Sequence, residues 1–138
     1  MNEIKNDCER IARNIGRTIE DIVNGKLWHN PKSGDFEPLP EENEDGERLD
    51  EDGNEIETAT LCDWLNKQLG DVRFEVRRDS TGKLEVTGGR VLCCFGGPNV
   101  WAEHDEIRAY WGNESATYPL TSDARDAMLD MLAEVFGE

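Results

Sequence analysis

A segment rich in carboxylates and prolines in the first half of the chain most restricts what the chain can fold into. Residues 35–57 contain twelve acidic side chains and one basic side chain, Arg48, and therefore carry a net charge of −11. The segment has few apolar side chains, a pattern typical of a solvated loop. We therefore expect a single domain spanning residues 1–138, with an acidic insert at about 30–57.

Helical patterns lie on both sides of this insert. Apolar residues recur at steps of three and four over residues 4–23, which predicts a long amphipathic helix. Thr58 or Thr60 is a candidate N-cap for a short second helix. A final helix is expected to begin near Thr121 and to bury its methionines.

Between the second and third helices, short runs of alternating apolar and polar residues predict an antiparallel meander of about five strands. The candidate runs are 72–77, 83–87, 90–95, 100–104, 107–111 and 115–120. The pairs Gly88-Gly89 and Gly96-Gly97 are predicted to lie in turns, and residues 48–56 to form a small hairpin. The order of elements predicts an α+β fold, and no internal repeat is expected among them.

The overall charge restricts the class of partner. Thirty-one acidic residues against fifteen basic ones give a net charge of −16. Nucleic acids and anionic membranes are bound by cationic side chains, so neither is expected as a direct partner. No apolar run approaches the roughly 20 residues of a membrane helix, and the first residues do not resemble a signal peptide. We expect a cytoplasmic protein of a bacterial host cell, and the oligomeric state stays open.

The cysteines and histidines do not have the spacing of a metal site. Cys8, Cys62, Cys93 and Cys94 form no Cys-x-x-Cys pair. Residues 50–54 match the opening of a calcium-binding EF-hand loop, but the rest of that motif is missing. We therefore expect buried, reduced thiols, and neither a metal ion nor a cofactor.

One enzymatic alternative remains open. Cys93 or Cys94 could act as a nucleophile with His104 as its base, or these residues could bind a metal. The side chains of Cys93 and Cys94 are expected on opposite faces of one strand. No third residue that would orient His104 is evident, so no catalytic residue is assigned.

Two groups of carboxylates are candidates for contact with a basic protein surface. Those in the insert are Glu44, Asp45, Glu47, Asp50, Glu51, Asp52 and Glu55. Those on the last helix are Asp123, Asp126, Asp130 and Glu134. The four helix acids follow one another at axial spacings of about 4.5–6 Å, which approximates the phosphates of a nucleic-acid strand.

Two aromatic side chains are added to these candidates. Strand alternation places Trp101 opposite its neighbours, and it places Tyr110 opposite Trp111. Trp and Tyr are frequent in protein-binding hot spots, so both are candidate contact residues.

Residues 93–120 carry three short motifs: Gly-Gly-Pro-Asn-Val-Trp at 96–101, Tyr-Trp-Gly at 110–112 and Ala-Thr-Tyr-Pro-Leu at 116–120. In these three motifs, the chain resembles small acidic proteins of bacterial mobile elements. The resemblance implies a non-enzymatic anti-CRISPR or other anti-defence protein, several of which mimic nucleic acids. Its partner would be a nucleic-acid-binding effector such as a CRISPR nuclease.

We therefore expect an inhibitor that places carboxylates on a basic channel of that effector. The insert carries the larger charge, so its acids are expected to contribute more to inhibition than the helix acids do. The second alternative, beside the enzyme, is an adaptor domain whose acidic loop only keeps it soluble.

Overall fold

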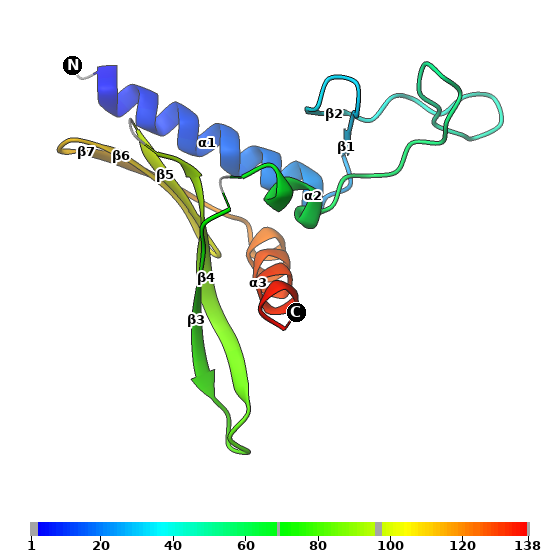
Figure 1. The fold of residues 1–138 in the computed structure, drawn as a ribbon. Helices are drawn as coiled ribbons and strands as arrows, with labels where there is room; N and C mark the ends of the chain where they lie inside the picture. The colour runs from blue at the N-terminus through cyan, green and yellow to red at the C-terminus, as the bar shows by residue number, and fades with distance from the viewer. Residues whose placement is uncertain (1–2, 69, 96–97, 138) are drawn as a thin grey trace.

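Five antiparallel strands, hydrogen-bonded in chain order, form the central sheet of the structure (Figure 1). The structure is a computed structural model that describes residues 3–68, 70–95 and 98–137. The strands are β3 (Val72–Arg78), β4 (Leu84–Cys94), β5 (Asn99–Glu103), β6 (Glu106–Trp111) and β7 (Glu114–Pro119). The predicted α+β fold and its meander are confirmed.

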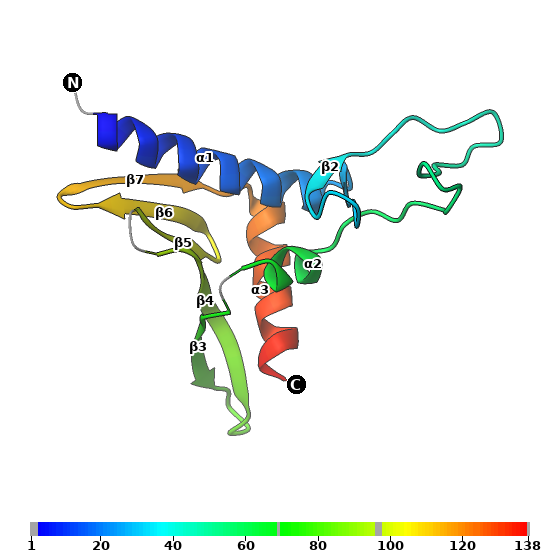
Figure 2. The ribbon, with the colours of Figure 1, turned by 45° about the horizontal axis from the view of Figure 1, so that its top comes forward.

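The helices pack on one face of this sheet. Helix α1 (Glu3–Val23) lies along β6 and β7, and α3 (Ser122–Phe136) lies along β4 (Figures 1 and 2). The short helix α2 (Leu61–Asn66) contacts both of them. In the described part of the chain, no helix has the length and apolar character to cross a membrane.

A single cluster of buried side chains joins α1, the sheet and α3. Its largest fully buried members are Ile19, Ile107, Met128, Leu132, Val91 and Val100. The predicted caps are also present. Thr60 forms a capping box with Asp63, and the Thr121 hydroxyl accepts a hydrogen bond from the Ala124 amide. The helix boundaries therefore follow from local chemistry.

The Gly88-Gly89 pair does not form the predicted turn. Both glycines lie inside β4, which pairs with β3 through a register shift between Glu75 and Val76. A Cβ atom on Gly89 would lie 2.5 Å from the Arg73 carbonyl oxygen and 3.0 Å from a Leu132 methyl carbon. These glycines therefore allow close packing within the sheet. The other predicted turn, Gly96-Gly97, lies outside the described residues.

The insert and the residues just before it contain more regular structure than predicted. Strands β1 (Leu27–His29) and β2 (Phe36–Pro38) form a two-stranded antiparallel sheet that the sequence analysis missed. The predicted hairpin at 48–56 is confirmed by a bridge between Leu49 and Glu55. Beyond β2, the chain extends away from the helices and the central sheet before it returns to α2 (Figures 1 and 2).

The Glu20 carboxylate of α1 holds this helix against β7, an edge strand of the central sheet. Glu20 accepts a hydrogen bond from the Tyr118 hydroxyl at 2.7 Å and one from the Thr121 amide at 3.0 Å. The Tyr118 ring packs directly against Gly16 of the same helix. Glu20 and Gly16 therefore connect α1 to β7 and to the start of α3.

Candidate functional site

The acidic part of the insert is a tandem repeat of seven residues. Residues 43–49 read Asn-Glu-Asp-Gly-Glu-Arg-Leu, and residues 50–56 read Asp-Glu-Asp-Gly-Asn-Glu-Ile. The expectation that the chain has no internal repeat is therefore wrong. Aligning the two Glu-Asp-Gly triplets in the sequence would have found it.

Each repeat begins with a tight turn closed by the same hydrogen bonds. In the first acidic turn (43–47), Asn43 Oδ1 accepts from the amides of Asp45 and Glu47, both at 2.9 Å. The Asn43 amide in turn donates to the Glu47 carbonyl oxygen at 2.7 Å. Gly46 has a φ of +78°, a left-handed conformation that glycine adopts without strain. The first acidic turn is thus closed by the Asn43 side chain together with its own backbone.

The second acidic turn (50–54) repeats this geometry with an aspartate in the first position. Asp50 Oδ1 accepts from the amides of Asp52 and Asn54, both at 2.9 Å. The backbone hydrogen bond from Asn54, above all, lowers the pKa of the Asp50 carboxyl below its usual value. Asp50 is half-buried and shapes the turn, a role that the sequence analysis did not foresee.

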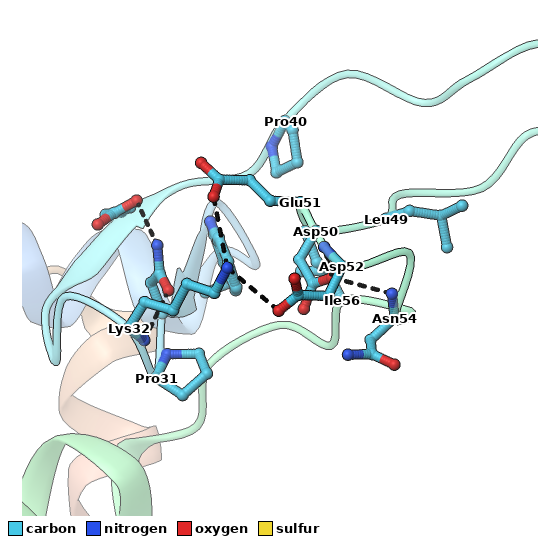
Figure 3. A pocket seen from close by; sticks show the side chains of 12 residues that line it. Pro31, Lys32, Pro40, Leu49, Asp50, Glu51, Asp52, Asn54 and Ile56 are labelled. Atoms are coloured by element: carbon cyan, nitrogen blue, oxygen red, sulfur yellow. Dashed lines mark hydrogen bonds and ion pairs between the residues drawn. The ribbon is translucent and has the colours of Figure 1, made fainter.

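The remaining predicted acids of the insert face solvent. They are Glu44, Asp45, Glu47, Glu51, Asp52 and Glu55. Lys32 places its Nζ atom 3.1 Å from Asp52 Oδ2 and 3.4 Å from Glu51 Oε2 (Figure 3). The insert thus presents two acidic turns in sequence, and a lysine of the chain itself contacts the second.

The acids of α3 form a separate surface. Asp123, Asp126, Asp130 and Glu134 are all exposed, and the methionines of α3 are buried on the opposite side, as predicted. Asp130 and Glu134 also line a shallow groove of about 320 Å³ between α1, α2 and α3. The described side chains of this surface stand on a regular helix and not on a loop.

The two aromatic candidates lie on the sheet face away from the helices. Trp101 and Tyr110 are half-buried and line a groove of about 540 Å³. The Arg90 guanidinium stacks 4.4 Å from the centre of the Trp101 ring, within the range of a cation–π contact. Arg108 in the same groove pairs with Glu103 at 3.4 Å. This groove is distinct from the acidic turns and carries both signs of charge.

The cysteines have several different environments. Cys8 is buried as predicted, but Cys62 is exposed on α2, so the expectation of four buried thiols is wrong. Cys93 and Cys94 are half-buried and both pack against the core cluster. A register shift between Leu92 and Cys94 interrupts the simple alternation predicted for this pair.

In the alternative cysteine–histidine pair, the thiol of Cys93 lies in surroundings that disfavour a thiolate. Burial raises the pKa of the Cys93 thiol to about 12, whereas a cysteine nucleophile needs thiolate at neutral pH. The Cys93 thiol lies 3.7 Å from the Val91 carbonyl oxygen, and His104 Nδ1 accepts a long hydrogen bond of 3.4 Å from the Gly89 amide. The two groups are thus held by different neighbours.

Within the described residues, no three His, Cys, Asp or Glu side chains are grouped so that they could hold a metal ion. We expect an excess of EDTA to leave the melting temperature unchanged, because no ligand cluster of that kind contributes to the folded state. Thermal unfolding followed by circular dichroism, with and without the chelator, measures this. A fall of several degrees on chelation would contradict the prediction.

A scan against protein-family models, a search of curated proteins and a search of solved structures found no match to the chain.

Proposed function

We propose that the chain is a non-enzymatic inhibitor that presents carboxylates to a basic, nucleic-acid-binding surface of a bacterial defence effector. A CRISPR nuclease is the type of effector that we favour. The carboxylates occupy the Lys and Arg side chains that otherwise bind phosphates, so the effector loses its nucleic acid. The inhibitor acts in the cytoplasm of the bacterial cell and binds no nucleic acid itself.

One observation carries this proposal: five acidic side chains are exposed on two turns that are closed by hydrogen bonds from backbone amides to the side chains of Asn43 and Asp50. The hydrogen bonds at Asn43 and Asp50 fix each turn before a partner arrives. A surface that is ordered in advance loses less conformational entropy on binding than a flexible acidic loop does. The turns therefore suit recognition better than a purely solubilising role.

A competition experiment tests this function. Purified, guide-loaded CRISPR nucleases and restriction endonucleases are each mixed with labelled cognate DNA and increasing amounts of the protein, and binding is followed by gel shift. We expect at least one effector to release its DNA, while the protein alone does not shift the DNA. If every effector keeps its DNA while the protein remains folded, the mechanism is wrong.

The affinity for the effector is expected to fall steeply with salt. Between about 50 and 500 mM NaCl, the screening length shortens from more than 10 Å to a few ångströms. An interface dominated by exposed carboxylates then loses affinity on the order of tenfold or more. Fluorescence anisotropy across this salt range measures the loss. An affinity independent of salt would instead favour an interface built on Trp101 and Tyr110.

A further inference from the structure

Three turns among the described residues share one backbone design but differ in charge. In the third turn (79–83), Asp79 Oδ1 accepts hydrogen bonds from the Thr81 amide at 2.8 Å and the Lys83 amide at 3.0 Å, the pattern of both acidic turns. Gly82 likewise has a positive φ, of +86°. In this turn Ser80 and Thr81 stand in the places of the two acids, and the turn ends in Lys83. Differences in cation binding among the three turns therefore report side-chain charge and not backbone shape.

The second acidic turn already forms ion pairs with a lysine of the same chain. The Lys32 ammonium group, from the loop between β1 and β2, bridges Glu51 and Asp52 (Figure 3). Glu44 and Asp45 occupy the corresponding positions of the first acidic turn. They are exposed, and no basic side chain of the described residues forms an ion pair with them. The two repeats thus carry equivalent pairs of carboxylates. The pair of the first turn is exposed to solvent, and the pair of the second turn contacts Lys32.

A cavity beside Lys32 has room for a further cationic side chain. It measures about 330 Å³ and lies between the β1–β2 loop and the second acidic turn (Figure 3). Its apolar walls include Trp28, Pro31, Leu49 and Ile56, and its rim carries the carboxylates that contact Lys32. Lys and Arg bury their aliphatic stems on such walls and keep the charged group at the rim. The chemistry of the cavity therefore fits a basic side chain.

We propose that Lys32 is an internal competitor for the second acidic turn, so that a lysine- or arginine-rich segment of a partner binds the first acidic turn before the second. The segment reaches the second turn by displacing Lys32. This inference rests on the proposed function, because it specifies how that acidic surface engages a basic partner. An exposed ion pair changes an affinity by at most about fivefold, so Lys32 tunes access and does not block it.

Titration of the ¹⁵N-labelled protein with an octalysine peptide at low salt resolves the three turns, because the amides of Gly46, Gly53 and Gly82 each report on one of them. In the unchanged chain, we expect Gly46 to shift first and Gly53 at a peptide concentration roughly two- to fivefold higher. Gly82 should not respond. In Lys32→Met, the midpoints for Gly46 and Gly53 are expected to coincide.

Two further variants separate the ion pair from the general loss of a positive charge. Lys32→Arg keeps a cation at the second turn and should keep the original order of response. Lys83→Met removes the same charge from the distant β3–β4 hairpin and should also keep that order. In Lys32→Met, the signal of Gly53 before peptide is added should stay that of the folded turn, because Asp50 still holds the backbone.

The proposal is overturned if Gly53 responds together with or before Gly46 in the unchanged chain. It is also overturned if Lys32→Met keeps the original order. The peptide titration contains no effector and no nucleic acid, so its outcome does not depend on the gel-shift experiment. The order of response can be present in a chain that inhibits no effector, and it can be absent from a chain that does.

Discussion

Replacing Gly16 by alanine is expected to lower the free energy of unfolding by about 2 kcal/mol, although alanine is the better helix former. A Cβ atom at this position would overlap the Tyr118 ring, with only 2.5 Å to its Cε2 atom. The ring cannot move away freely, because the Tyr118 hydroxyl is bonded to Glu20. An overpacking cost of about 3 kcal/mol exceeds the gain in helix propensity, which is about 1 kcal/mol.

Urea unfolding followed by circular dichroism measures this loss. Asn14→Ala serves as the matched control, because Asn14 is an exposed residue of the same helix and should change stability by no more than about 0.5 kcal/mol. In a Tyr118→Ala background the ring is absent, and Gly16→Ala should then cost little or nothing. A Gly16→Ala chain as stable as the unchanged one would show that α1 does not pack on β7 at this position.

The sequence predicted those elements that local chemistry determines. The three-to-four periodicity gave α1, and Thr60 and Thr121 marked the starts of α2 and α3 because their hydroxyls satisfy free helix amides. Strand alternation likewise identified the outward position of Trp101. These features depend on neighbours within a few residues, and such neighbours can be identified from the sequence alone.

The errors concern contacts between distant segments. Gly88-Gly89 resembles a turn in sequence, and only the approach of Arg73 and Leu132 shows why β4 needs glycines there. The strands β1 and β2 are three residues each, too short to show a strand pattern in the sequence. Cys62 occupies an apolar position in the helical pattern, yet α2 leaves it exposed.

In the candidate site, too, local features could be predicted from the sequence and contacts between distant segments could not. The exposure of the insert acids could be predicted from charge alone, because an unpaired carboxylate is too costly to bury. The structural role of Asp50 and the position of Lys32 could not, because they depend on how the turns fold and on contacts across the insert. The repeat was visible in the sequence, but its meaning became clear only with the matching hydrogen bonds at Asn43 and Asp50.

The strongest functional effect is expected from four substitutions in the acidic turns: Glu44→Gln, Asp45→Asn, Glu51→Gln and Asp52→Asn. We expect this variant to lose inhibition of its effector by tenfold or more, on the order of what several charge contacts contribute to a complex. The turns themselves should remain folded. Their closing acceptors, on Asn43 and Asp50, are untouched.

The matched comparison neutralises the four acids of α3 in the same way, with Asp123→Asn, Asp126→Asn, Asp130→Asn and Glu134→Gln. Both variants lose four negative charges, so the net charge changes equally and a difference in inhibition reports where the partner binds. We expect the helix variant to lose inhibition by no more than about threefold, because its charges lie apart from the preorganised turns. Dose–response curves for release of DNA from the effector give both values. A helix variant that fails while the turn variant still inhibits would assign the contact to α3, and two fully active variants would exclude acidic mimicry.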